Sequence, residues 1–278
     1  MASSVEKVDF QAFEGWVRSN YRPKSAYDKV YYAKRHVHCL TSGDCSSLQA
    51  LSDDQRSHAM SALSSLSKFL GIYETWMSLV KNYGLKWSVK RDDLIISRFT
   101  RIEDPNEVFD WVGWVKDSCP DLCGFMDLML YSGLRFEEGV NSHNLVLKLA
   151  KEGRLSEYYD TQKEVLEHFQ FKELFIRRTK KAFISFVPKK IVKRIGKERE
   201  LNRFCVQSKV KRKTGRIRFG DIREAHGTVL TRHLNASEID FLHGRVSGSV
   251  FMRNYFNPAL IGDLKERVFK GIGCLMEG

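Results

Sequence analysis

Residues 125–135 read Phe-Met-Asp-Leu-Met-Leu-Tyr-Ser-Gly-Leu-Arg, an apolar run that ends at a Ser-Gly pair and is followed at once by an arginine. The apolar part predicts a buried helix. The Ser-Gly pair predicts its end, because glycine readily adopts the left-handed conformation that closes a helix. An arginine just after such a turn is well placed to point into a cleft. The alternative is that Arg135 is a surface residue paired with Glu137 or Glu138.

The rest of the chain has several more segments with a helical pattern of apolar side chains. These stripes are Phe10, Phe13, Trp16 and Val17; Tyr27, Val30, Tyr31, Ala33 and Val37; Met60, Leu63, Leu66, Phe69 and Leu70; Trp76, Leu79, Val80 and Tyr83; and Val108, Trp111, Val112 and Val115. Gly84 predicts the end of the fourth stripe. We therefore expect a mainly α fold with a small antiparallel β-sheet (α+β), in which a helical bundle at residues 1–90 precedes a second domain at residues 91–278, with a connector near residues 85–100.

The composition indicates a polyanionic partner. The 278 residues carry a formal net charge of +12, with a pI near 9.4, and 42% hydrophobic residues supply material for real cores. Nucleic acid is the simplest partner for such a protein, and an anionic membrane surface is the alternative. No apolar run reaches the roughly 18 to 20 residues of a membrane span, and the amino terminus lacks an apolar signal core. We expect a soluble, cytoplasmic protein that does not bind membranes.

The six cysteines are expected to be free thiols, since a large domain of this kind does not need disulfide bonds. His36, His38, Cys39 and Cys45 lie close together in the sequence, but the paired spacing of a zinc site is missing. We expect neither a metal nor a cofactor.

Most of the net charge of the protein is concentrated in residues 172–218, where eighteen Lys or Arg face three Glu. DNA or RNA should lie across this segment. Residues 173–178 and 182–187 alternate like the strands of a hairpin, with Lys180 and Lys181 at its tip. Either lysine could protonate a leaving oxygen, or both could be ordinary solvated turn residues.

Other cations of this region are expected to contact phosphates and to contribute affinity and salt dependence. They are Arg177, Arg178, Lys189, Lys190, Lys193, Lys209, Lys211, Arg212, Lys213, Arg216 and Arg218.

Taken in order, these features resemble the tyrosine recombinase (phage-type integrase) family. The features are Gly133-Leu134-Arg135, the basic hairpin, Ile222-Arg223-Glu224 at a helix start, Leu242-His243-Gly244-Arg245, and Tyr255 in Phe251-Met252-Arg253-Asn254-Tyr255-Phe256. Arg223 precedes Arg245 by 22 positions and Arg245 precedes Tyr255 by 10, spacings similar to those of the family. The resemblance covers the whole chain, with its motifs in residues 125–258. It implies that residues 1–90 form a DNA core-binding domain and residues 91–278 a catalytic domain.

The resemblance implies a role for each matching residue. Tyr255 would attack the scissile phosphate and leave a 3′-phosphotyrosyl bond and a free 5′-hydroxyl, without metal or cofactor. Arg135 and Arg223 would clamp the non-bridging oxygens, and Arg245 would make a further phosphate contact. Lys180, or else Lys181, would be the general acid. The partners would be double-stranded DNA attachment sites, with four protomers assembled on the DNA.

The chain departs from the family pattern in two places. Gly220 stands where the family usually has histidine, and Arg245 follows Gly244 where the family has histidine or tryptophan. An arginine at the second place is similar to the archaeal fuselloviral type of integrase, which implies a mobile element. The candidates for the missing group are His226 and a lysine of residues 209–213, and the alternative for His226 is a packed helix histidine.

Further alternatives stay open at this point. The protein could be a relative that binds DNA without cutting it, or a type IB-like topoisomerase that religates the same strand. Tyr255 could be only an aromatic anchor for the amphipathic tail at residues 260–274, and that tail could pack on a neighbouring protomer or on its own domain. The charged segment 148–169 is interpreted as an inserted helical element.

Overall fold

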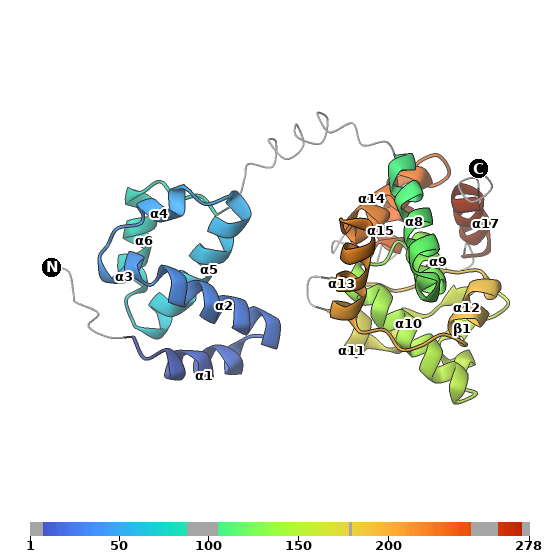
Figure 1. Ribbon diagram of the computed structural model, residues 1–278, viewed down its shortest axis with the longest axis horizontal. Coiled ribbons are helices and arrows are strands. Elements are labelled where there is room, and N and C mark those ends of the chain that lie inside the picture. Colours follow the sequence, from blue (N-terminus) through green and yellow to red (C-terminus); the bar gives the residue numbers. More distant parts are fainter. Residues whose placement is uncertain (1–7, 88–104, 178–179, 246–260, 274–278) are drawn as a thin grey trace. The chain divides into compact units, whose positions relative to one another are not determined.

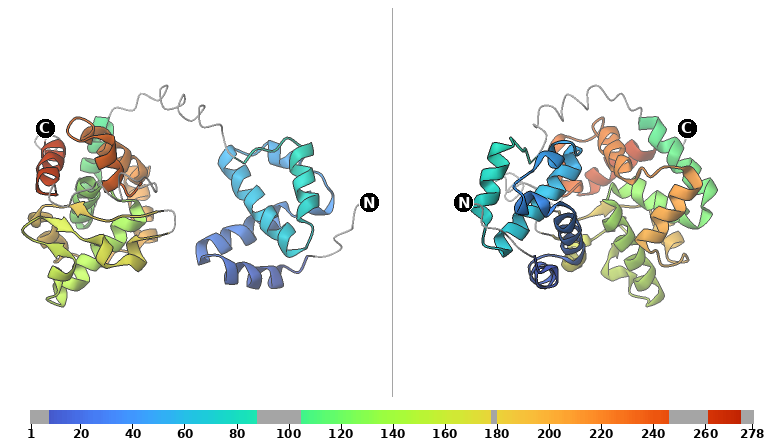
Figure 2. Two further views of the ribbon diagram at one scale, coloured as in Figure 1. Left: turned by 180° about the vertical axis from the view of Figure 1, so that it is seen from behind. Right: turned by 60° about the vertical axis from the view of Figure 1, so that its left-hand side comes forward.

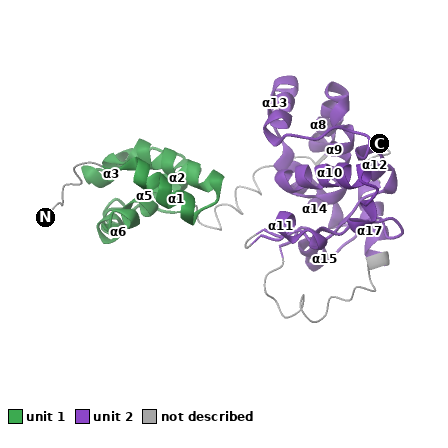
Figure 3. Cartoon of the chain, turned by 90° about the horizontal axis from the view of Figure 1, so that it is seen from below, with its two compact units in different colours: residues 1–102 green, residues 103–278 purple. Residues whose placement is uncertain are grey.

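The computed structural model describes residues 8–87, 105–177, 180–245 and 261–273, and the chain divides into two compact units at residues 1–102 and 103–278 (Figure 3). The described part is mostly helical with one three-stranded antiparallel sheet, which confirms the α+β fold class. Most of the expected connector lies outside the described residues. Among the helices that are described, none is both long and apolar enough to cross a membrane.

Unit 1 consists of helices packed against one another (Figures 1 and 2). They are α1 (Phe10–Asn20), α2 (Pro23–His36), α3 (His38–Thr41), α4 (Ser46–Gln49), α5 (Asp53–Phe69) and α6 (Tyr73–Asn82). Their shared core contains Phe13, Leu63 and Trp76, which are fully buried, and the helical stripes are confirmed except at Tyr27 and Tyr31, which are exposed. Gly84 has a φ of +58° just after α6, as its role as a helix stop requires.

Unit 2 contains the other elements. They are α8 (Pro105–Ser118), η1 (Pro120–Leu122), α9 (Cys123–Ser132), α10 (Phe136–Lys151), η2 (Leu155–Glu157), β1 (Tyr159–Asp160), β2 (Val165–Leu166), η3 (His168–Gln170), α11 (Lys172–Phe175), β3 (Ser185–Phe186), α12 (Lys189–Ile195), α13 (Arg203–Thr214), α14 (Phe219–Leu230), α15 (Ala236–Leu242) and α17 (Ile261–Gly273).

Helix α9 is the centre of unit 2. Every residue from Gly124 to Ser132 is buried, and the helix packs against α8, α10, α12 and α14. Apart from Asp127, whose carboxylate pairs with Lys116 and Arg194, the helix is almost entirely apolar, and such a helix is stable only inside a core. Gly133 ends it with a φ of +56°, which confirms the predicted turn before Arg135.

The sheet corrects the interpretation of residues 148–169. Helix α10 ends at Lys151, and the following chain forms β1 and β2 instead of an inserted helix. Asp160 accepts hydrogen bonds from the backbone N–H groups of Gln162 and Lys163, which fixes the turn between the two strands. Lys148 and Lys151 belong to the end of α10, whereas Asp160, Lys163 and Glu164 lie in or beside the turn between the strands.

The long hairpin expected over residues 173–187 is also wrong. Its first arm contains the short helix α11. In the described part of the turn, pairing is confined to the bridge between Ile176 and Lys181 and to backbone hydrogen bonds beside it, from Arg177 N–H to the Lys180 carbonyl and from Ala182 N–H to the Phe175 carbonyl. The second arm pairs elsewhere, because β3 adds to β2 with Val165 opposite Phe186. The Phe175 side chain is fully buried in the core, and this burial holds α11 in place.

Helix α17 packs on unit 2 itself. Of the two alternatives for the tail, packing on a neighbouring protomer or on its own domain, the structure shows packing on its own domain. Leu264, Val268 and Ile272 are buried in the same core as the sheet. Arg267 fastens the helix through hydrogen bonds of 2.6 and 2.9 Å to the carboxylate of Glu238.

A buried histidine joins β3 to the segment before β1. His168 Nε2 lies 2.8 Å from Ser185 Oγ, and its Nδ1 lies 2.7 Å from the hydroxyl of Tyr158. Complete burial lowers the pKa of His168 to about 3, because the charged imidazolium would lose its hydration. His168 is therefore neutral in the folded protein at ordinary pH.

We expect the free energy of unfolding to fall as the pH falls from about 6.5 toward 3. The unfolded chain binds a proton at His168 near pH 6.5, whereas the folded chain does so only near pH 3. The contribution of neutral His168 to stability is therefore complete above about pH 6.5 and is lost progressively as the pH falls toward 3. One such group contributes at most about 1.4 kcal/mol per pH unit. Urea titrations at successive pH values measure this slope. In His168→Gln the slope should be smaller, and an equal slope in both proteins would contradict the prediction.

Candidate active site

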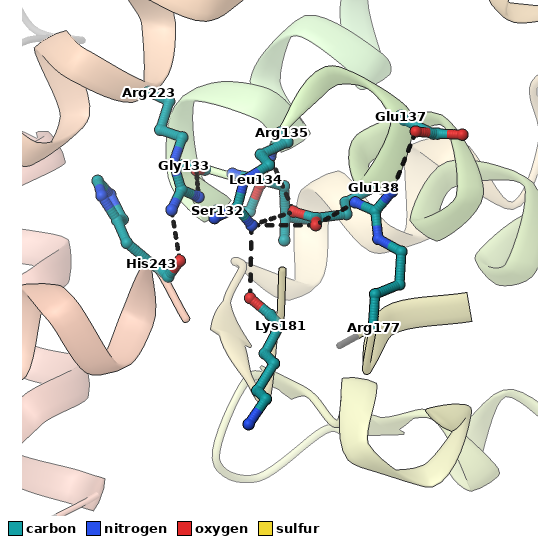
Figure 4. Close-up of polar contacts among 10 residues, drawn as sticks. All are labelled: Ser132, Gly133, Leu134, Arg135, Glu137, Glu138, Arg177, Lys181, Arg223 and His243. Atoms are coloured by element: carbon teal, nitrogen blue, oxygen red, sulfur yellow. Dashed lines mark hydrogen bonds and ion pairs between the residues drawn. The ribbon is translucent and has the colours of Figure 1, made fainter. Parts of the chain in front are cut away.

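Two arginines that are distant in the sequence meet at the turn after α9 (Figure 4). Arg135 is the N-cap residue of α10, and Arg223 lies in the first half of α14. Arg223 Nη1 donates a hydrogen bond of 2.8 Å to the carbonyl of Gly133, and its Nη2 donates to the carbonyl of His243. The turn that positions Arg135 therefore also holds Arg223.

The electrostatic environment of Arg223 is strongly positive. Its side chain is largely buried, and this burial, together with the charge of Arg135 and a smaller effect of Arg245, lowers its pKa to about 10. The guanidinium remains charged at neutral pH. A bound anion would relieve both the repulsion and part of the desolvation, so the arrangement favours an anionic ligand.

One buried carboxylate lies among these cations. Glu138 is fully buried and accepts hydrogen bonds from Arg135 Nη1 at 3.0 and 3.2 Å and from Arg177 Nη2 at 2.8 Å. Arg135 does pair with Glu138, as the alternative interpretation held, but the pair is inside the protein and not on its surface. Glu138 fixes the orientation of Arg135 and Arg177, and its negative charge offsets part of the repulsion between Arg135 and Arg223.

The tip of the basic segment touches this site through its backbone. The Lys181 carbonyl lies 3.5 Å from Arg135 Nη1, whereas Figure 4 shows the Lys181 side chain directed away from Arg135 and Arg223. Gly244 packs against the same carbonyl so closely that a Cβ there would overlap it. The Lys180 side chain is exposed, and Arg178 lies outside the described residues.

Two buried histidines, His226 and His243, form a hydrogen-bonded pair next to Arg223. His226 Nε2 donates to the carbonyl of Tyr131 at 3.2 Å, so its Nδ1 must accept the 3.0 Å hydrogen bond from His243 Nε2. Burial lowers the pKa of His226 to about 4. A Cβ on Gly133 would lie 2.5 Å from His226 Nδ1, so the two residues pack tightly. His226 is therefore a packed helix histidine, the alternative interpretation, and not a free group that could replace the missing one.

Sequence reasoning missed His243. It is buried, and its Nδ1 has no hydrogen-bond partner in the described part of the chain. Burial, with a further contribution from His226, lowers its pKa to about 2, so it is neutral. His243 is part of the Leu242-His243-Gly244-Arg245 segment, but the interpretation of that segment centred on Arg245. The Arg245 side chain is half-exposed, and its Nη1 lies 3.9 Å from Asp240 Oδ1.

The expected phosphate contacts divide into two groups. Lys189, Lys190, Lys193, Lys211, Arg212, Lys213 and Arg216 are exposed on α12, on α13 and just after α13. Three others are engaged in ion pairs within the protein: Arg177 with Glu137 and Glu138, Lys209 with Asp121, and Arg218 with Asp221 and Glu107. Arg218 is also buried, so these three are not free surface cations.

Tyr255, the expected nucleophile, lies outside the described residues. Five cysteines, Cys39, Cys45, Cys119, Cys123 and Cys205, are free thiols. Within residues 8–87, 105–177, 180–245 and 261–273, no group of three or more His, Cys, Asp or Glu side chains is arranged to hold a metal ion. No protein-family model matches this chain, and no curated protein or solved structure is similar enough to count as a match.

Proposed function

We propose that this protein is a site-specific DNA recombinase that cuts and rejoins DNA through a covalent bond to Tyr255. The observation that carries the proposal is the convergence of Arg135 and Arg223 on the turn at Gly133. Arg245 adds a third positive charge to their surroundings. A phosphodiester under attack needs cations at its non-bridging oxygens, and guanidinium groups make paired hydrogen bonds to such oxygens.

In the proposed reaction, the hydroxyl oxygen of Tyr255 attacks the scissile phosphorus and passes its proton to solvent water. The bond from phosphorus to the 5′-oxygen breaks, and that oxygen takes up a proton from Lys180, or else Lys181, to become a free 5′-hydroxyl. The 5′-hydroxyl of a second strand then attacks the phosphorus and returns a proton to the lysine. The bond from phosphorus to the Tyr255 oxygen breaks, and that oxygen takes up a proton from water, which restores a phosphodiester and the tyrosine hydroxyl. No outside energy source is required, because the covalent bond conserves the phosphodiester.

The exposed cations of α12 and α13 support binding to DNA. Lys189, Lys190 and Lys193 share the short α12, and Lys211, Arg212 and Lys213 form the last turn of α13. Contacts of this kind add affinity that decreases with salt and carry little sequence information. We propose duplex attachment sites as the DNA partner, with four protomers assembled on them.

A DNA-binding protein that does not cut is the second candidate. Gly220 has no side chain where the family has its histidine, and open space surrounds it. Both nitrogens of His226 are already engaged, so this residue does not replace the missing group. Such a protein would bind DNA equally well with or without the Tyr255 hydroxyl.

A covalent trap distinguishes the two candidates. The protein is incubated with DNA that flanks its own gene and carries scattered nicks, then denatured in detergent and examined for protein-bound DNA. We expect an adduct with the wild type and none with Tyr255→Phe, at equal DNA affinity. Salt-sensitive binding without any adduct on this DNA would favour the non-cutting protein, and an adduct that persists in Tyr255→Phe would contradict the assignment of the nucleophile.

A further inference from the structure

The outer face of α2 in unit 1 carries two exposed tyrosines. The opposite face of the helix is buried against α5 and α1 through Ala26, Val30 and Ala33. Tyr27 and Tyr31, one helical turn apart, are 69% and 47% exposed. Their rings are nearly parallel, at 12°, with centroids 6.5 Å apart. A large aromatic area is therefore open on this face.

Cations surround the tyrosine pair. Lys24, Lys34 and Arg35 are exposed on the same side of α2 as the tyrosines, because residues three, four and seven positions apart share a helix face. Arg35 Nη1 donates a hydrogen bond of 3.3 Å to the hydroxyl of Tyr31. None of the three cations makes an ion pair to a described carboxylate, and the helix has a single acidic residue, Asp28. The face is complementary to a polyanion that also offers flat rings.

Other occupants fit this face less well. A second copy of the chain would bring like charges together, which is unfavourable. A lipid surface would need aliphatic side chains between the cations, and the exposed large apolar residues of α2 are the two tyrosines alone. Phosphates and bases together match both features.

We propose that the α2 face, defined by Lys24, Tyr27, Tyr31, Lys34 and Arg35, binds a nucleic-acid strand whose bases are unpaired. The cations hold the phosphates and the two tyrosine rings stack on bases. In a duplex the faces of the bases are covered by the neighbouring pairs, so only an unpaired segment can use the rings. This activity goes beyond the cutting and rejoining of strands and does not depend on Tyr255.

The test uses the full-length Tyr255→Phe protein, in which the proposed chemistry is switched off, and measures affinity by fluorescence anisotropy. The probes are a labelled oligothymidylate, which has unpaired bases, and a labelled duplex. Adding Tyr27→Ala and Tyr31→Ala together should weaken oligothymidylate binding at least about 30-fold and duplex binding less than about twofold. Both side chains are exposed and alanine favours helix, so the fold should remain.

Two controls separate stacking from other effects. Tyr27→Phe with Tyr31→Phe keeps the rings and should keep the affinity for oligothymidylate. Trp114→Ala removes an aromatic residue as exposed as Tyr31 from α8 and should leave the affinity unchanged. Unchanged affinity of the double alanine variant, or an equal loss on the duplex, overturns the proposal. A missing covalent adduct in the trap experiment would count against the recombinase alone.

Discussion

Replacing Arg223 with alanine is expected to slow strand cleavage about 100- to 1000-fold, in line with the loss of one group that stabilises developing charge. Its guanidinium is held by the carbonyls of Gly133 and His243, which fixes it before any substrate arrives. The exposed cations of α12 and α13 remain, so most of the DNA affinity should remain too. Arg223→Lys should lose nearly as much activity, because an ammonium group cannot satisfy both carbonyls and the phosphate in the same plane. The rate of adduct formation at saturating DNA measures the effect.

Arg218 provides the matched control for this prediction. It is as buried as Arg223, at 7% against 9% exposure, and it is the N-cap residue of the same helix α14. Its ion pairs include those with Asp221 and Glu107, whereas Arg223 donates hydrogen bonds to the carbonyls of Gly133 and His243. Arg218→Ala should therefore destabilise the protein without a large change in the rate of cleavage by the folded fraction. If it slows cleavage as much as Arg223→Ala does, the loss comes from damage to α14 and the active-site assignment of Arg223 is wrong.

The helices were predictable where one sequence signal was long and ended clearly. Helix α9 is an apolar run followed by Gly133, and both its burial and its end are confirmed. The strands gave no such signal, because β1, β2 and β3 have two residues each, too few for an alternating pattern. The pairing of β2 with β3 depends on contacts between residues far apart in the chain, Leu166 with Ser185 and Val165 with Phe186. In the sequence, the charged residues around the turn at Asp160 were mistaken for the exposed face of a helix, which is why residues 148–169 were predicted to be helical.

The candidate site was predictable as a set of arginines but not as a structure. The sequence order singled out Arg135 and Arg223, and these two residues do lie together. The contacts of Glu138, His226 and His243 could not be read in advance, because they arise only when α9, α10, α14 and α15 converge. The same limit applies to Lys181, whose carbonyl and not its ammonium faces Arg135.

Replacing Gly244 with alanine is expected to reduce the free energy of unfolding by about 2–4 kcal/mol and to slow cleavage as well. Gly244 closes α15 with a φ of +57°, where its N–H bonds to the Phe241 carbonyl and the Arg245 N–H bonds to the Asp240 carbonyl. Alanine is strained in this conformation. Its Cβ would also overlap the Lys181 carbonyl, and a backbone atom cannot rotate away as a flexible side chain can.

The effect on cleavage follows from the shared carbonyl. To admit a methyl group at position 244, the chain at Lys181 must move, and with it the oxygen that faces Arg135 Nη1. Urea titration measures the loss of stability, and the covalent trap measures the loss of cleavage. Gly220→Ala is the matched control, because that glycine lies within α14 with open space around it, where alanine should be neutral or slightly stabilising. If Gly244→Ala is as stable as Gly220→Ala, Gly244 does not pack against the Lys181 carbonyl, and this description of the site is wrong.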